Sequence, residues 1–259
     1  MPESFVEKLE RANQHLNSLE SDIHRWLESK PYTMLYEPDL NTGENIISID
    51  AGKPPETISP TIGDCVHNLR SSLDHLVYSL AIKNRSGLTD EEAAETSFPI
   101  FKMRDSRVSD GLSPRGRGRI KYLSIEAQTI IKGLQPFHAG KDATLHWLWI
   151  LEKLNNIDKH RRLLVTATHL GGIMVGVPSR SSIGMWEPYI GPIKGKTELT
   201  RLRASHMDIP KTSVQVEFIP TLTVAFVDPP AEGRHVLLTL ESIRRYVLDT
   251  VLPPLGALL

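Results

Sequence analysis

The sequence predicts an α+β fold, in which a helical bundle carries an antiparallel β-sheet inserted before the C-terminal helix. Apolar residues recur every three or four positions in several long segments, which is the periodicity of amphipathic helices. Between about 165 and 228 the period changes to two, and turns with Gly or Pro separate short apolar runs. We therefore expect one domain, 1–259, with a β-rich insertion at about 165–228. Its helical core consists of about 3–30, 61–84, 124–164 and 235–252.

The first segment, 3–30, is expected to be a long amphipathic helix. Its apolar residues alternate in steps of four and three: Phe5, Leu9, Ala12, Leu16, Leu19, Ile23 and Trp26. This seam is like that of a coiled coil, so the helix packs either within its own bundle or against a second copy. We favour its own bundle, because roughly three to four heptads are the lower limit for a coiled coil. Pro31 ends the helix, and the β-rich runs 32–36 and 44–50 form a hairpin.

The central helix, 61–84, has two occupied faces, and Thr61 is its expected N-cap. One face is a core stripe of aliphatic residues: Ile62, Val66, Leu69, Leu73, Leu76, Val77 and Leu80. The other, here called the polar ridge, carries Asp64, His67, Asn68, Ser71, Asp74, His75 and Tyr78. A face that only meets solvent more often carries Lys and Glu, so the polar ridge indicates a site.

The region 85–121 reads as irregular, apart from a short helical turn at about 89–95. Its most conspicuous part is S-P-R-G-R-G-R-I-K, where cations alternate with glycine. These cations are Arg115, Arg117, Arg119 and Lys121. A flexible loop of this composition can surround phosphate groups, and the alternative is a surface loop without a ligand.

Two further helices are expected before the β-rich insertion. Ser124 caps a short helix that Pro136 ends, and a longer helix follows at about 143–164. The apolar face of the longer helix continues directly into Asn155 and Asp158, as where a helix runs from a core into a polar pocket. We expect Asn155 and Asp158 to face the polar ridge residues His67, Asn68, Ser71, Asp74 and His75.

Four runs predict the strands of the insertion: L-L-V-T-A-T, I-M-V-G-V, T-E-L-T-R-L-R and S-V-Q-V-E-F-I-P-T-L-T-V-A-F-V. Their connections look too short for helical crossovers, so we expect antiparallel pairing. Pro220 divides the last run or marks a bulge. The final helix, 235–252, has an apolar side that needs the earlier helices as neighbours.

Composition limits the function. The chain has 30 Lys and Arg against 31 Asp and Glu, so any nucleic-acid binding must depend on a local patch of cations. The N-terminus is charged and no apolar run approaches the roughly 18 residues of a membrane span, so we expect a cytoplasmic protein without membrane contact. The single cysteine, Cys65, excludes an internal disulfide and is expected to be a small buried residue.

Three kinds of chemistry fit the polar ridge. In a metal site, Asp64 and His67, or Ser71, Asp74 and His75, would bind with Asp158 or His160. No H-E-x-x-H or paired E-x-x-H motif is present, so we expect no metal or other cofactor. In a structural network, the acids would hold Arg70 and the imidazoles, and Asn155 would bridge two helices. The third kind is cleavage of nucleic acid.

The stretch H-N-L-R-S-S-L-D-H-L resembles the R-x4-H signature of the HEPN superfamily, whose all-helical domains include many metal-independent ribonucleases of toxin, antiphage and CRISPR systems. Arg70 and His75 match the two signature positions, and Ser71 stands where that family commonly has Asn, Asp or His. The resemblance implies a dimer in which Arg and His of two copies meet at one cleft. The pattern G-D-x-x-H-N-L-R-S-x-L-D-H with a later N-I-D-K-H-R is also similar to a group of uncharacterised bacterial proteins, which implies no activity.

We therefore expect a HEPN-like, metal-independent ribonuclease that binds RNA and forms a homodimer through its helical face. His75 would act as acid or base, Arg70 would stabilise the phosphorane, and Asp74 or Asn68 would orient a partner. The other expected site residues are His67, then Asn155, Asp158 and His160 of the second helix, and Arg115, Arg117, Arg119 and Lys121 as RNA contacts. The alternative is a non-enzymatic ligand-binding or protein-interaction module with a structural polar network between its helices.

Overall fold

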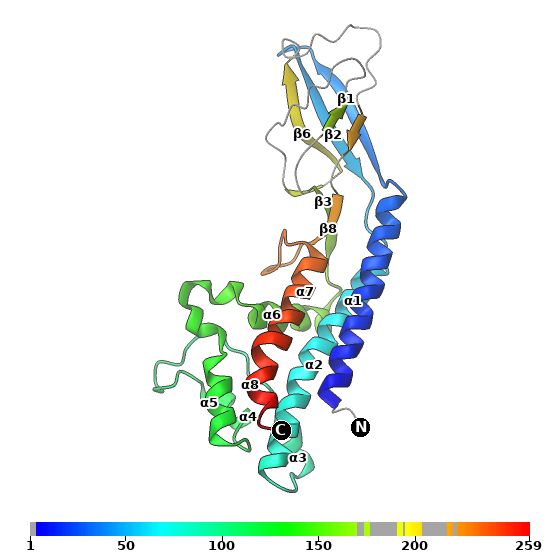
Figure 1. Cartoon of the computed structure of the whole chain (residues 1–259). Helices are drawn as coiled ribbons and strands as arrows, with labels where there is room; N and C mark the ends of the chain where they lie inside the picture. Colours follow the sequence, from blue (N-terminus) through cyan, green and yellow to red (C-terminus); the bar gives the residue numbers. More distant parts are fainter. Residues whose placement is uncertain (1–3, 170–173, 177–190, 194, 204–216, 220–221) are drawn as a thin grey trace.

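Two long helices lie side by side and form the spine of an elongated molecule (Figure 1). The computed structural model describes residues 4–169, 174–176, 191–193, 195–203, 217–219 and 222–259. Helix α1 (Ser4–Glu28) leads into the hairpin β1 (Tyr32–Asp39) and β2 (Glu44–Ala51), and α2 (Ile58–Asn84) returns along α1. All seven residues of the predicted α1 seam are buried, so the seam packs within its own chain.

Helix α2 begins three residues before the predicted start. Thr57, not Thr61, stands at the N-cap position, so the predicted cap is wrong. Thr61 lies in the first turns, where its hydroxyl donates to the Thr57 carbonyl over 2.9 Å. Pro60 does not stop the helix, because a proline in the first turn removes only an N–H that has no intrahelical partner.

The region predicted to be irregular contains two short, well-capped helices. Helix α3 (Asp90–Glu95) has a capping box between Thr89 and Glu92, at the predicted helical turn. Helix α4 (Pro114–Arg119) occupies the stretch predicted to be a flexible basic loop, so that prediction is wrong. The physical reason is Ser113 as N-cap with Pro114 directly after it. A Cβ on Gly116 would come within 2.7 Å of Leu112, so this glycine serves close packing.

The next helices lie near their predicted places. Helix α5 (Ile125–Gly133) is capped by Ser124 as predicted, and the 3₁₀ segment η1 (Pro136–Leu145) follows. Helix α6 (Trp147–His160) starts and ends four residues inside the predicted 143–164. Its start is fixed by His146, whose ring nitrogen accepts from the Leu148 N–H over 3.2 Å.

The strands form small sheets, and each described pair is antiparallel as predicted. They are β3 (Val165–His169), β4 (Met174–Gly176), β5 (Gly191–Pro192), β6 (Lys196–Arg203), β7 (Glu217–Ile219) and β8 (Leu222–Phe226). The sheet orders are β1-β2-β6, β5-β3-β8 and β4-β7. The N-terminal hairpin thus pairs with a strand of the insertion, which the sequence did not indicate. Pro220 lies outside the described residues.

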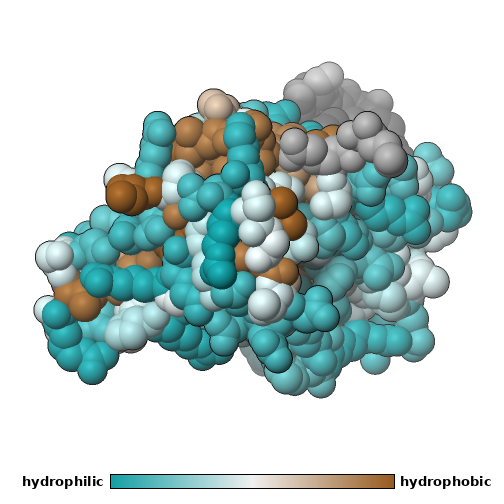
Figure 2. All heavy atoms as spheres, turned by 90° about the horizontal axis from the view of Figure 1, so that it is seen from below, coloured by the Kyte–Doolittle hydropathy of each residue, from teal (hydrophilic) through white to brown (hydrophobic). Residues whose placement is uncertain are grey.

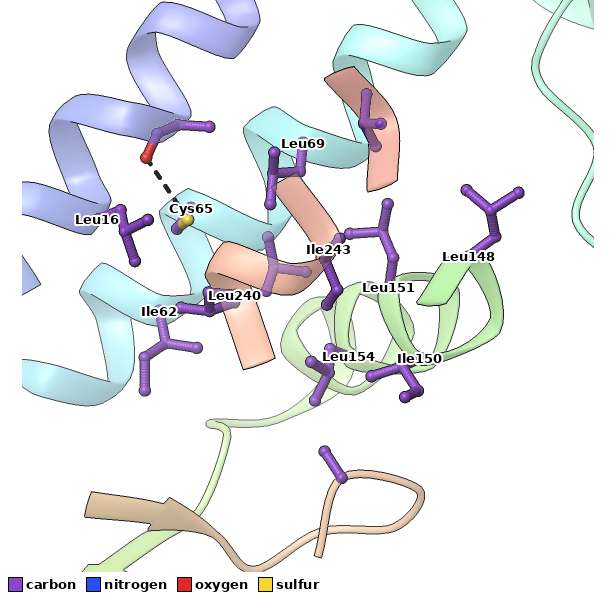
Figure 3. Packing of buried hydrophobic residues seen from close by; sticks show 14 of the residues in the cluster. Leu16, Ile62, Cys65, Leu69, Leu148, Ile150, Leu151, Leu154, Leu240 and Ile243 are labelled. Carbon is purple, nitrogen blue, oxygen red and sulfur yellow. Dashed lines mark hydrogen bonds between the residues drawn. The ribbon is translucent and has the colours of Figure 1, made fainter. Parts of the chain in front are cut away.

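The C-terminal elements α7 (Val236–Tyr246), η3 (Val247–Val251) and α8 (Leu252–Gly256) return to the helical body, as predicted. Figure 3 shows Leu151 of α6, Ile243 of α7 and Leu69 of α2 in one core. Cys65 is buried there and its thiol donates to the Ala12 carbonyl over 3.5 Å. Burial raises the pKa of Cys65 to about 12, so the thiol stays protonated.

The surface of the helical end is mostly hydrophilic, with a hydrophobic patch on one part of the face seen from below (Figure 2). Across the described residues, no helix combines the length and the apolar composition that a membrane crossing needs.

Candidate functional site

The polar ridge of α2 divides between different neighbours along the helix. Asp74 accepts from the Phe98 N–H and from Arg70, which lies beside the ridge and meets α6, and His75 meets the start of α1. Asp64 and His67 lie at the far end of α6, close to Asp158. The ridge therefore does not form one continuous site.

Arg70 forms the most complete set of contacts. Its Nε donates to Glu152 Oε2 over 2.9 Å, Nη1 donates to Asp74 Oδ1 over 2.6 Å and Nη2 donates to the Phe98 carbonyl over 2.8 Å. The Phe98 N–H closes the ring by donating to Asp74 Oδ1 over 2.9 Å. We call Arg70, Asp74, Glu152 and the Phe98 backbone the Arg70 network. It ties α2 to α6 and to the segment between α3 and α4.

The charges of the Arg70 network balance the burial of the guanidinium. Arg70 is only 7% exposed. Burial lowers its pKa, but the charges of Asp74 and Glu152 outweigh burial and raise the pKa above its ordinary value. Arg70 is therefore a fixed cation inside the helix contact.

His75 is separated from Arg70 around the helix. Its Nδ1 is 2.9 Å from the Ser4 hydroxyl, at the start of α1. Five residues of an α-helix turn through about 500°, which leaves Arg70 and His75 about 140° apart. Within one chain, the two signature residues thus contact different helices, α6 for Arg70 and α1 for His75.

Asp158 meets the N-terminal part of α2, as expected. Its carboxylate lies against Gly63, where the Cβ of any other residue would overlap it. Burial raises the pKa of Asp158, the negative charge of Asp64 raises it further, and the charge of His67 opposes the shift. We call Asp64, His67 and Asp158 the His67 cluster. The G-D-x-x-H and N-I-D-K-H stretches therefore meet in space.

Two of the predicted site residues, Asn68 of α2 and Asn155 of α6, are buried amides. Asn68 donates to the Asp64 carbonyl of its own helix over 2.8 Å. Asn155 is 3% exposed, and within the described chain its side chain makes no hydrogen bond, so the predicted bridge to α2 does not form. Ser71 likewise makes no hydrogen bond to α6 among these residues. His160 is exposed at the end of α6.

The four predicted RNA-binding cations have different surroundings. Arg117 pairs with Asp110 over 2.6 Å, and Lys121 pairs with Glu95 over 3.1 Å. Arg115 and Arg119 form no ion pair with any described residue. Burial lowers the pKa of Arg119, the charges of Arg115 and Arg70 lower it further, and Glu152 and Asp74 oppose them. Arg119 therefore lies within electrostatic reach of the Arg70 network.

Sequence reasoning missed Glu152, the Phe98 backbone and Gly63. Glu152 precedes Asn155 by one helical turn, so its position on α6 was a usable signal. The Phe98 carbonyl carries no signal, because every residue has one. Among the described residues, no group of three or more His, Cys, Asp or Glu side chains could hold a metal ion. Comparison with family models, curated proteins and solved structures found no match.

Proposed function

We propose that the chain is a non-enzymatic binding module in which the Arg70 network is a structural tie between helices. The contacts of Arg70 carry this proposal, because its Nε, Nη1 and Nη2 all donate to protein atoms. An arginine that stabilises a phosphorane must instead direct its donors at the substrate. Arg70 would have to break these contacts before it could do so.

A HEPN-like arrangement of the helices belongs to the same proposal. It is supported by the R-x4-H stretch on α2 and by the contacts of α2 with α1, α6 and α7. The strands between α6 and α7 would then be an addition to the helical unit.

Metal-independent RNA cleavage by a homodimer is the second candidate, and the His67 cluster is the observation that favours it. The pKa of Asp158 is raised and the exposed His67 lies within electrostatic reach, so a carboxyl and an imidazole are available for proton transfer. In this candidate, His67 and Asp158 of each copy take the acid–base roles, because Arg70 is engaged.

Two substitutions on α2 test the proposal. Arg70→Met removes the charge from the buried network and leaves Asp74 and Glu152 unpaired, so we expect a loss of about 3 kcal/mol in the free energy of unfolding. His75→Ala removes a half-exposed contact to Ser4 and should cost less than about 1 kcal/mol. Urea unfolding measures both. Equal, small losses would contradict the structural role of Arg70.

An RNA cleavage assay in EDTA tests the two candidates against each other. We expect no cleavage by the parent chain, by His75→Ala or by His67→Ala. Cleavage by the parent that His67→Ala abolishes, in a variant with unchanged unfolding, would replace the proposal with the ribonuclease candidate.

A further inference from the structure

Trp149 on α6 is placed between two cations. Lys153 Nζ lies 4.9 Å from the centre of the indole ring, and Lys102 Nζ lies 5.2 Å from it. Trp149 as a whole is half-buried. Neither lysine forms an ion pair with a described residue. The ring thus lies in a local concentration of positive charge.

This concentration continues to α4. Trp149 and Glu152 are one helical turn apart on α6, and Glu152 accepts from Arg70. Phe98, which accepts from Arg70, is followed four residues later by Lys102, which lies over Trp149. The N–H of Ser97, directly before Phe98, donates to the Arg119 carbonyl over 3.3 Å. Arg119 lies within electrostatic reach of Glu152 and Arg70, and Arg115 within reach of Arg119. We call Lys102, Arg115, Arg119, Trp149 and Lys153 the Trp149 surface.

The acids next to the Trp149 surface are already engaged. Asp74 and Glu152 both accept from Arg70, and Glu152 also accepts from Asn156 over 3.3 Å. None of the four cations of the surface forms an ion pair with a described residue, and Lys102 and Lys153 instead lie over the indole ring. On a chain with a formal net charge of −1, this is the local cation patch that binding of a polyanion requires.

Tyr122 provides an internal comparison. Arg85 and Lys121 lie 5.0 and 4.7 Å from its ring centre, so it too is an aromatic ring with two cations. Arg85 pairs with Glu92 and Lys121 pairs with Glu95, over 2.8 and 3.1 Å. The Tyr122 cations are thus neutralised locally, whereas those at Trp149 are not. The difference gives a matched control.

We infer that the Trp149 surface binds single-stranded nucleic acid. A base stacks on the indole in place of the lysine ammonium groups that lie over it, and these lysines then contact the phosphates together with Arg115 and Arg119. A stacked ring accepts only an unpaired base, so a duplex does not fit this arrangement. Stacking and phosphate contacts do not read the 2′-hydroxyl, so RNA and DNA strands should bind alike. The inference rests on the proposed binding function and names its ligand class.

Fluorescence anisotropy with labelled 12-nucleotide oligo-U and oligo-dT, with a duplex of the same length, tests the inference on the full chain. We expect Trp149→Ala to weaken binding of both strands roughly tenfold and Trp149→Phe to restore most of it, since phenylalanine also stacks. The matched Tyr122→Ala should leave the affinity unchanged. Tighter binding of the duplex, or equal losses for Trp149→Ala and Tyr122→Ala, would overturn the inference.

A second test leaves the half-buried Trp149 in place and changes only cations. Arg115→Gln with Arg119→Gln should reduce the slope of log affinity against log salt by about 0.7 for each phosphate that the variant no longer neutralises. The control Lys121→Gln removes a locally paired cation and should leave the slope unchanged. A slope that Lys121→Gln lowers as much as the double variant would also overturn the inference.

These experiments separate failure of the proposed non-enzymatic function from failure of the inference about Trp149. Cleavage of oligo-U in EDTA would contradict the non-enzymatic proposal. Oligo-dT lacks the 2′-hydroxyl that metal-independent cleavage uses, so its binding still decides whether Trp149 is the contact.

Discussion

The two ends of the contact between α2 and α6 differ in how completely their polar groups are paired. At the Arg70 end, every buried charge has a partner and the ring of contacts closes through the Phe98 backbone. At the other end, the charge of Asp64 raises the pKa of Asp158 and that of His67 opposes the shift, and Asn155, one helical turn before Asp158, has no hydrogen-bond partner within the described chain. A buried amide without a partner costs about 1–3 kcal/mol, so only the Arg70 end behaves as a structural tie.

The surfaces at Tyr122 and Trp149 also differ in how completely their charged groups are paired. At Tyr122, each cation has its own carboxylate, and at Trp149 the nearby carboxylates are held by Arg70 instead. Asp74 and Glu152 still act on Arg119, whose pKa they raise against the effect of burial, but neither forms an ion pair with it.

After Arg70→Met, the largest effect that would test the comparison is expected at Gly63. Gly63→Ala places a Cβ where the Asp158 carboxylate lies, so α6 has to move and the free energy of unfolding should fall by about 2 kcal/mol. Gly118→Ala is the control, because a Cβ on this residue of α4 meets nothing within 4 Å. It should stabilise the chain by about 0.5 kcal/mol through the higher helix propensity of alanine. A Gly63→Ala variant as stable as the parent would show that the two helices do not approach closely at this end.

A smaller effect is expected from Glu152→Gln, at the Arg70 end. The substitution keeps the shape of the side chain but removes one of the two charges that hold Arg70, so stability should fall by about 1 kcal/mol. Combining it with Arg70→Met in a double-mutant cycle measures the coupling directly. Additive losses would mean that the two residues do not act as one network.

The sequence predicted the parts of the fold that depend on local patterns. The α1 seam, the Ser124 cap and the β1–β2 hairpin follow from periodicity, capping and turn residues, and the structure contains all three. The sequence did not predict the features that depend on contact with a second element of the fold. Gly116 looked like a flexible loop residue because its close packing against Phe101 is a tertiary contact, and pairing of β2 with β6 joins distant segments.

The candidate site also has features that the sequence could predict and features that it could not. The meeting of Asp158 with α2 was predictable, because the apolar stripe of α6 leads directly into it. The separation of Arg70 from His75 was also implicit in their five-residue spacing. The roles of Glu152 and of the Phe98 carbonyl were not predictable, because a partner for Arg70 depends on how α6 and the segment after α3 fold against α2.

The smallest expected effect concerns Asp158 and depends on pH. Because the pKa of Asp158 is raised in the folded chain, its protonated form is favoured there, and folding stability should fall as pH rises from the ordinary value of 3.8 through the raised value. Asp158→Asn removes this dependence. The free energy of unfolding of the variant should therefore rise relative to that of the parent over that pH interval, and the difference should persist up to neutral pH. Urea unfolding between about pH 3 and 7 measures the difference.

Asp105 supplies a control of opposite sign. Its hydrogen bonds from Arg107 lower its pKa to about 2, so its contribution to stability is present above 3.8 and is lost as pH falls toward 2. As pH rises, Asp105→Asn should therefore become less stable relative to the parent, whereas Asp158→Asn should become more stable relative to it. Parallel curves for the parent and Asp158→Asn would mean that neither burial nor Asp64 disfavours the Asp158 carboxylate. The His67 cluster would then lose the raised pKa of Asp158 that favours it as a site, and only the unpaired amide of Asn155 would still distinguish the two ends of the α2–α6 contact.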